Sequence, residues 1–349
     1  EYMINLSNYI FLLFPLVLII SSCSDQGNSD YHYDPQPYEL NIPENYPPIR
    51  IPENNLLTEE GVLLGRHLFY DPIISSNGSY SCSTCHKSNF NFSDNVQFST
   101  GSDGHLKKVN TMPLFNVAFY TRHGWNGKIE TIENDVQITI SALHGDWSKL
   151  ISDLSEDTLY QRLFFEAFGA VEIKPEQIEK SISQFVRSLV SFNTRYDSII
   201  AGLADPTLSE MRGFELFFTE EGDCFHCHID PLFTNLGFHN NALDSLENMD
   251  SGFELVTGMN MDKGKFKVPT LRNLAYTAPY MHDGRFNNLK DVIDFYSEGL
   301  QFSVYADSNM KNLHKGGIQI SKEDKNALIS FLNTLNDHSL KNNALLKKP

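Results

Sequence analysis

The chain has 349 residues, 41% of them hydrophobic and 12% aromatic, and its formal net charge is -17. This length fits two globular domains of ordinary size. The acidic balance argues against a nucleic-acid partner, whose phosphates need basic side chains, and favours a basic or dipolar protein partner.

The first feature along the chain is an apolar run from Ile10 to Ile20, followed by Ser21, Ser22 and Cys23. The run is too short to span a bilayer but long enough for the core of a signal peptide. Its end resembles a bacterial lipoprotein cleavage box, so we predict a signal peptide over 1–22 and a lipid on Cys23. An ordinary signal peptide or a short anchor is the alternative. The protein would then be exported and lipid-anchored, facing the periplasm or the cell surface.

Residues 23–55 are rich in Pro, Asn, Tyr and Ser, which predicts a tether. Helix signals begin after this segment. Thr58 with two acidic residues behind it predicts a helix that ends before Pro72, and residues 75–110 predict mostly loop. Pro175 opens an amphipathic helix, and Ser321 caps the last one. Further helices are expected over 145–168, 208–218 and 289–296. We predict an all-α fold with two haem-binding domains, 56–192 and 193–340, long loops and a tail over 341–349.

Two copies of Cys-x-x-Cys-His carry the strongest signal, Cys82-Ser-Thr-Cys85-His86 and Cys224-Phe-His-Cys227-His228. This spacing is typical of c-type haem, in which each thiol bonds a vinyl group and the histidine ligates the iron. A pair of redox dithiols or a zinc site is the alternative. The sequence therefore predicts two covalently bound haem c groups, one in each domain.

At these and neighbouring residues the chain resembles the bacterial dihaem cytochrome c peroxidase and MauG superfamily. The matching segments are Leu64-Gly-Arg-His-Leu-Phe-Tyr-Asp71, Trp125-Asn-Gly-Lys128, Lys267-Val-Pro-Thr-Leu-Arg-Asn273 and Thr277-Ala-Pro-Tyr-Met-His-Asp-Gly-Arg285. The resemblance implies two cytochrome c-like helical domains packed across a shared interface, and a possible homodimer. It also implies that peroxide meets the haem on His86, that electrons enter at the haem on His228, and that Trp125 lies between them.

The resemblance also suggests metal ligands. In typical peroxidases of the superfamily a Met at the position of Tyr296 ligates the second iron, and in the MauG branch a Tyr does. We therefore favour Tyr296 as the iron ligand, with Met281 as the alternative. Asn110, Thr277 and Pro279 match a calcium site at the domain interface, so a calcium ion is expected as well.

The peroxidatic site departs from the family pattern. The family usually has a Gln and a Glu ten and twenty residues after the bridging Trp, where this chain has Asp135 and Gly145. Asp135, His144 or Asp146 could move the proton instead, and we name Asp135 and His144 with Trp125 as the catalytic candidates. The histidine that blocks the iron in many relatives corresponds to Ser102, so we expect an open iron, with His105 as a displaced ligand in the alternative.

Three functions follow. The leading hypothesis is a peroxidase that reduces hydrogen peroxide with electrons from a small redox protein such as cytochrome c. The second is a MauG-like enzyme that uses peroxide to oxidise residues on a partner protein. The third is a dihaem electron carrier without catalysis.

Overall fold

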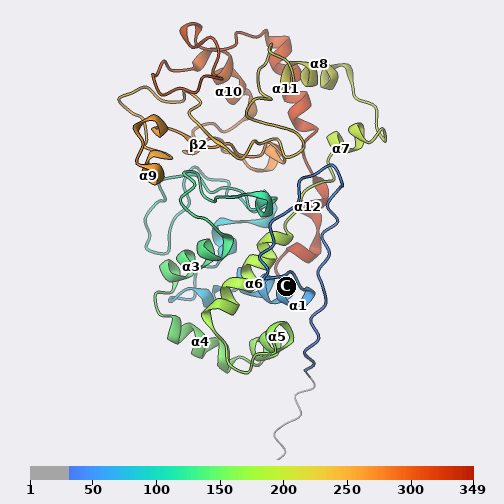
Figure 1. Ribbon diagram of the computed structural model, residues 1–349, viewed down its shortest axis with the longest axis vertical. Helices are drawn as coiled ribbons and strands as arrows, with labels where there is room; N and C mark the ends of the chain where they lie inside the picture. The colour runs from blue at the N-terminus through green and yellow to red at the C-terminus, as the bar shows by residue number, and fades with distance from the viewer. Residues whose placement is uncertain (1–30) are drawn as a thin grey trace, which may run out of the picture. The chain divides into compact units, whose positions relative to one another are not determined.

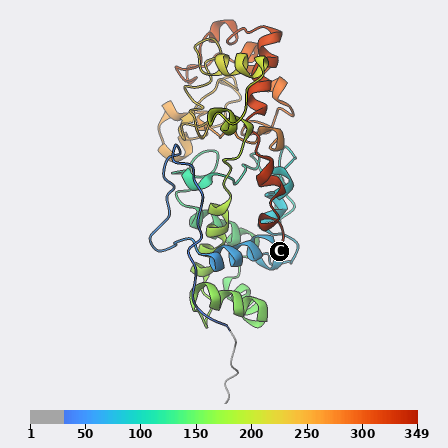
Figure 2. The same ribbon diagram turned by 90° about the vertical axis from the view of Figure 1, so that its right-hand side faces the viewer.

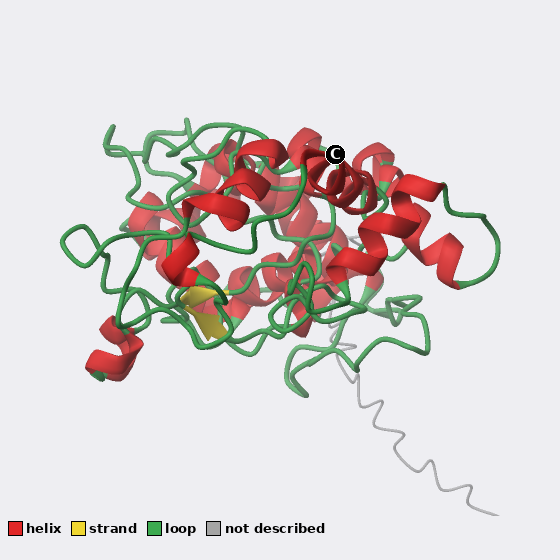
Figure 3. Ribbon diagram, turned by 90° about the horizontal axis from the view of Figure 1, so that it is seen from above, coloured by secondary structure: helices red, strands yellow, loops and turns green. Residues whose placement is uncertain are grey.

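The structure, a computed structural model, describes residues 31–349, and residues 32–349 form one compact unit. The predicted signal peptide and Cys23 lie outside the described residues. Helices and long loops make up nearly all of this unit (Figure 3), which confirms the predicted fold class. Within it, no helix has the length and the hydropathy needed to cross a membrane.

The first half of the described chain contains six helices around one hydrophobic core. The side chain of Thr58 accepts a hydrogen bond from the backbone N–H of Gly61, which confirms the predicted start of the first helix. The next long helix begins at Ile132 and was not predicted. The helices are α1 (Glu59–Tyr70), α2 (Cys82–Cys85), α3 (Ile132–Leu143), α4 (Trp147–Glu156), α5 (Thr158–Phe168) and α6 (Pro175–Ser188).

The second half has its own core and six more helices. Ser321 caps the last long helix by accepting from the N–H of Asp324, as predicted. A short antiparallel pair, β1 (Phe238–His239) and β2 (Phe266–Lys267), was not predicted. The helices are α7 (Arg195–Ile200), α8 (Leu208–Phe217), α9 (Glu254–Thr257), α10 (Leu289–Asp294), α11 (Lys322–Asn333) and α12 (His338–Asn342). Figure 1 shows α8, α10 and α11 gathered away from α1, α4, α5 and α6.

The helix that precedes each haem motif crosses a second helix at a glycine. Helix α1 packs on α6, and α8 packs on α11. A β-carbon on Gly65 would lie 1.8 Å from the carbonyl oxygen of Ser181, and one on Gly213 would lie 2.0 Å from the carbonyl oxygen of Ala327. Only glycine allows such an approach of two backbones. Both haem motifs therefore follow the same kind of helix crossing.

Both ends of the described chain contact distant elements. Residues 31–55, which we predicted as a tether, include the buried Tyr46, whose ring packs against Phe119 and Phe192. At the other end, the hydroxyl of Tyr70 in α1 donates to the carbonyl of Leu346 at 2.7 Å. The C-terminus accordingly lies beside α1 in two views (Figures 1 and 2). The predicted domain boundaries themselves remain predictions.

A buried ion pair within the second half holds the N-terminal segment. Arg272 is fully buried, and its guanidinium donates to both carboxylate oxygens of Asp197 at 2.8 and 2.9 Å. The same guanidinium donates to the hydroxyl of Tyr46. Burial pushes the pKa of Asp197 up, but the bonds and charge of Arg272 hold it below its usual value. This trio, the Arg272 clamp, fixes the N-terminal segment against the second half.

Candidate haem sites and the residues that connect them

The histidine of each haem motif is held by a backbone carbonyl. His86 Nδ1 lies 2.9 Å from the carbonyl oxygen of Phe92, and His228 Nδ1 lies 3.0 Å from that of Phe233. A carbonyl only accepts, so Nδ1 carries the proton and Nε2 keeps the lone pair that an iron needs. Burial lowers the pKa of both rings, to about 4 for His228, so both are neutral at pH 7.

The carbonyl that holds His228 is itself fixed by the segment 267–273. The oxygen of Phe233 also accepts from the backbone N–H of Leu271 at 3.3 Å. Thr270 Oγ1 donates to the carbonyl of Leu232 at 2.6 Å, and Arg272 Nε to that of Pro231 at 2.9 Å. The Arg272 clamp is therefore connected to the carbonyl that holds His228 through one loop.

The cysteines fit haem better than the two alternatives. Burial raises the pKa of Cys82 and of Cys224 to about 12, whereas a redox dithiol needs a lowered pKa. Within residues 31–349, the one group of metal-binding side chains that converge contains Glu220, Asp223 and His226 and no cysteine. The four cysteines therefore form no zinc site.

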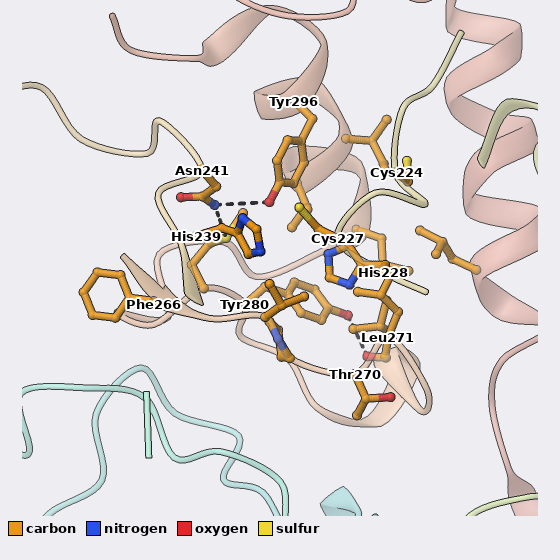
Figure 4. Close-up of a pocket in the computed structure, with 18 of the residues that line it drawn as sticks. Cys224, Cys227, His228, His239, Asn241, Phe266, Thr270, Leu271, Tyr280 and Tyr296 are labelled. Atoms are coloured by element: carbon orange, nitrogen blue, oxygen red, sulfur yellow. Dashed lines mark hydrogen bonds between the residues drawn. The ribbon is translucent and has the colours of Figure 1, made fainter. Parts of the chain in front are cut away.

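A largely apolar cavity surrounds the second motif (Figure 4). Cys224, Cys227 and His228 line it together with Trp125 and Asn110 from the first half of the chain. Its volume and lining suit a flat, mostly apolar group bonded to the two thiols. The second Cys-x-x-Cys-His motif therefore lines a cavity that suits haem and that both halves of the chain help to form.

Lys267 is the unusual polar group of this cavity. It is 1% exposed, and its Nζ has no hydrogen-bond partner among residues 31–349. The ammonium lies 4.9 Å from the ring centres of Tyr120 and of Phe238. Burial lowers its pKa to about 8, so most of it is still charged at pH 7. A buried cation needs an anion, and a haem propionate would supply one.

Both candidates for the second iron ligand line this cavity. Tyr296 follows α10 in a π-helical turn, Phe295–Gly299, rather than in the continuous helix that we predicted. Turns of this kind often occur at functional sites. Met281 has a backbone φ of +74°, a strained value for a non-glycine residue. Asn241 Nδ2 lies 3.1 Å from the Tyr296 hydroxyl oxygen and 3.6 Å from the Met281 sulfur. Burial raises the pKa of Tyr296 to about 12.

Trp125 is bonded to both halves of the chain. Its Nε1–H donates to the carbonyl of Asn110 at 2.8 Å, and its own carbonyl accepts from the N–H of Lys267 at 2.8 Å. The N–H of Asn110 in turn donates to the carbonyl of His282 at 2.7 Å. A chain of short hydrogen bonds thus runs from the indole to the residue beside Met281.

The three residues predicted to bind calcium, Asn110, Thr277 and Pro279, line the same cavity. The amide nitrogen of Asn110 donates to the carbonyls of Val96 and Gln97, each at 3.1 Å. Its amide oxygen accepts no hydrogen bond from any residue that the structure describes. An uncharged oxygen of this kind is a ligand that Ca²⁺ takes.

The two predicted proton-transfer residues do not meet. Asp135 lies in the first turn of α3, and burial raises its pKa to about 6. Its charge in turn raises the pKa of Cys82, which places it close to the first haem motif. His144 ends the same helix nine residues later, about 13 Å away at the helical rise per residue. It is buried, and its Nδ1 has no partner in the described chain. His105 is exposed, in a surface loop.

Comparison with known proteins agrees with this arrangement. The profile of the di-haem cytochrome c peroxidase family matches residues 59–205. The methylamine utilization protein MauG of Methylophilus methylotrophus is 31% identical, over 93% of this chain and 96% of the relative. The chain belongs to the di-haem cytochrome c peroxidase and MauG family. This membership confirms the resemblance seen in the sequence and implies two haems and peroxide as the family's oxidant.

Two further relatives of this dihaem family show its breadth. Cytochrome-c peroxidase IdrP1 of Pseudomonas sp. (strain SCT) is 28% identical, over 83% of this chain and 84% of the relative. The crystal structure of a MauG-like protein associated with microbial copper homeostasis superposes with a TM-score of 0.81 at 32% identity. The superposition covers 89% of this chain and 99% of the MauG-like protein. Relatives of both the peroxidase and the MauG type therefore share this fold.

The sequence reasoning missed two residues of this dihaem site. Lys267 stands in a segment that we recognised, but it follows Lys263 and Lys265 in the sequence, so nothing marked it as the buried lysine. Asn241 carries no sequence signal, because its partner Tyr296 lies 55 residues away. Its place at the start of the family-matching segment 267–273 was the one signal that could have pointed to Lys267.

Proposed function

We propose that the protein is a MauG-like enzyme that uses hydrogen peroxide to withdraw electrons from residues on a partner protein. The observation that carries this proposal is Tyr296 in the second haem cavity, with its hydroxyl held by Asn241 at 3.1 Å. A phenolate ligand donates charge and favours oxidised iron, whereas a thioether raises the reduction potential. An oxidised, low-potential second haem suits an enzyme that stores oxidising equivalents. Two relatives above 30% identity are named MauG.

Bound haem would supply the redox chemistry, in which one peroxide takes two electrons and two protons and leaves as two waters. The chain supplies the proton route and the electron route. Asp135 lies near the first haem motif with a pKa of about 6, suited to take and return a proton near neutral pH. Trp125 offers an indole whose N–H faces a peptide carbonyl, a hydrogen-bond acceptor that does not take the proton away.

The second candidate function is a cytochrome c peroxidase, and Met281 favours it. Its sulfur lies in the same cavity, 3.6 Å from the Asn241 amide nitrogen. With Met281 on the iron, the second haem would have the higher potential that suits reduction by a small electron-donor protein. The acidic chain, at -17, would attract a basic donor.

Calcium at Asn110, Thr277 and Pro279 is part of the proposal. The free amide oxygen of Asn110 and the cavity position of all three residues support it. A cation here would sit on the hydrogen-bonded route from His282 to Trp125. We also propose export to the periplasmic side with a lipid on Cys23, because haem attachment of this type is completed outside the cytoplasm.

The test is to add hydrogen peroxide to the purified diferric holoprotein by stopped flow, with and without reduced cytochrome c. Rapid oxidation of both haems without cytochrome turnover is the expected result for the MauG-like function. Sustained cytochrome oxidation would instead establish the peroxidase. No reaction in the resting or the half-reduced protein would overturn both and leave an electron carrier.

A further inference from the structure

One amide group stands between the two candidate iron ligands of the second haem. Asn241 lies in the loop after β1, and its Nδ2 is 3.1 Å from the Tyr296 oxygen and 3.6 Å from the Met281 sulfur (Figure 4). An amide nitrogen carries two hydrogens, so Asn241 can donate to both acceptors at once. Its side chain lines the cavity that contains Cys224, Cys227 and His228.

The two acceptors differ in what they gain from this donor. A tyrosine that ligates ferric iron does so as a phenolate, and hydrogen bonds to charged oxygens are about twice as strong as neutral ones. A thioether sulfur is only a weak acceptor. Asn241 therefore stabilises the state with Tyr296 on the iron more than the state with Met281 on it.

The Met281 side chain is flexible enough to compete with Tyr296 for the iron. Its side chain has three rotatable bonds and adapts to irregular space. Its backbone, at a φ of +74°, is held in a conformation that non-glycine residues rarely adopt, in the segment that forms the cavity wall. Among residues 31–349, the amide of Asn241 is the only side-chain donor bonded to the Met281 sulfur or to the Tyr296 oxygen.

Two histidines that also line the cavity, His239 and His282, make their contacts elsewhere. His239 Nδ1 lies 2.6 Å from Asp307 Oδ2, and its Nε2 lies 3.0 Å from Asn235 Nδ2. The ring of His282 stacks on Phe266 at 3.7 Å between ring centres. Neither ring is bonded to Tyr296 or Met281 among the described residues, so the amide of Asn241 is the group that can distinguish them.

We propose that Asn241 is a positioning residue that selects Tyr296 over Met281 as the second axial ligand of the haem bound at His228. This inference rests on the proposed function only in that it requires haem in this cavity. It makes the choice between a low-potential and a high-potential second haem depend on one side chain outside the iron's coordination sphere. Through that choice, Asn241 decides whether the protein suits a protein substrate or a cytochrome donor.

The experiment compares purified holoproteins of wild type, Asn241→Leu, and Asn241→Leu with Met281→Leu. In each we would measure the ferric absorption and electron paramagnetic resonance spectra and the midpoint potential of the second haem. We expect Asn241→Leu to show thioether-ligated haem and a reduction equilibrium constant at least tenfold higher, a rise of about 59 mV for one electron. The double variant should lose both changes, because no thioether remains.

Asn248→Leu is the control, since Asn248 is an exposed asparagine in the loop that follows Asn241 and is not among the residues that line the cavity. If Asn241→Leu does not load haem, Asn241→Asp keeps the shape and replaces the donor with a negative charge. That carboxylate would repel a phenolate, so it should produce the same change as Asn241→Leu. Spectra and potentials that stay at the wild-type values overturn the inference, and so does a rise that persists without Met281.

The failure of the proposed function would look different. These spectra and potentials are read in the resting protein without peroxide or partner. A wild type that does not react with peroxide but changes ligand in Asn241→Leu would overturn the proposed function and support the inference. A reactive wild type with no ligand change in Asn241→Leu or Asn241→Asp would do the reverse.

Discussion

At the scale of single residues, Lys267 offers a direct test of haem in the second cavity. Its unpartnered ammonium, 1% exposed, would stabilise the extra electron of a reduced haem. We expect Lys267→Met to lower the potential of the second haem by about 59 mV or more, a tenfold change in the reduction equilibrium. Redox titration of the holoprotein measures this change.

The control is Lys265→Met, which removes the same charge two residues earlier. The ammonium of Lys265 is already paired with Asp262 at 2.9 Å, so we expect its loss to leave the potential almost unchanged. Equal shifts in the two variants would mean that only net charge acts, and that Lys267 does not face the haem.

Asp135 predicts a pH dependence. Burial raises its pKa to about 6, and a base must be ionised to take a proton from peroxide. The rate constant for haem oxidation by peroxide should therefore be constant above this pH and fall about tenfold per pH unit below it. In Asp135→Asn the rate should be low and lose this dependence, as stopped flow from about pH 4.5 to about pH 8 would show.

Asp153→Asn serves as the comparison for Asp135→Asn, because Asp153 is a carboxylate on the surface of α4, paired with Lys149. Its pH profile should match the wild type. If the pH profile of the rate constant keeps its wild-type inflection in Asp135→Asn, another group carries out the proton step. The buried His144 would be the next candidate.

At the scale of elements, the glycine crossings predict a large cost for a small change. Gly213→Ala would place a β-carbon 2.0 Å from the carbonyl oxygen of Ala327 and force α8 and α11 apart. We expect a loss of about 1–3 kcal/mol in the free energy of unfolding, despite the better helix propensity of alanine. Thermal unfolding followed at the haem absorption and by circular dichroism would measure it.

Met211→Ala is a suitable control, since Met211 is exposed on the same helix and should change stability by less than about 0.5 kcal/mol. Gly65→Ala should repeat the effect in the first half, where α1 crosses α6. A Gly213→Ala variant as stable as the wild type would mean that the two helices can separate without loss of packing.

The elements that the sequence predicted correctly are those with local signals. Caps at Thr58 and Ser321 and the proline at the start of α6 act within a few residues, so they are readable from the chain alone. Helix α3 was missed although Thr131 caps it by accepting from the N–H of Asn134. Its buried residues form a stripe of only three, Ile132, Val136 and Ile140, because its other faces are turned to solvent or polar groups.

At the scale of the whole molecule, the Arg272 clamp predicts that one buried ion pair of the second half, which also holds Tyr46 of the N-terminal segment, contributes strongly to stability. Arg272→Met would leave the half-buried Asp197 carboxylate without its partner, at an expected cost of about 3–5 kcal/mol. The ion pair holds the pKa of Asp197 below its usual value, so its stabilisation is present at neutral pH and is lost as the pH falls through that lowered pKa. The wild type and the variant should therefore become more alike in acid.

Denaturant unfolding at several pH values tests this prediction. Arg272→Met with Asp197→Asn should recover part of the loss, because no unpaired charge remains. A constant difference between wild type and Arg272→Met down to strongly acidic pH would show that packing, and not the ion pair, carries the effect.

The parts of the site that the sequence could not predict are all long-range contacts. The haem motifs are local, so Cys82, Cys85, Cys224, Cys227 and both histidines could be read directly. Three other features depend on how distant segments meet. They are the contact of Asn241 with Tyr296, the hydrogen bond from Trp125 to Asn110, and the cavity that Lys267 lines. No periodicity or spacing encodes such contacts. Of these residues, the resemblance to the family supplied Trp125, Tyr296 and Asn110, but neither Asn241 nor a role for Lys267.

The Arg272 clamp also bears on the order in which the chain folds. Tyr46 and Arg272 are 226 residues apart in the sequence, so their contact closes a very long loop. During synthesis, Tyr46 emerges long before Arg272 exists. The N-terminal segment can therefore make this contact only after most of the chain has been made. If haem is attached during that interval, Cys82 and Cys85 react before the contact closes.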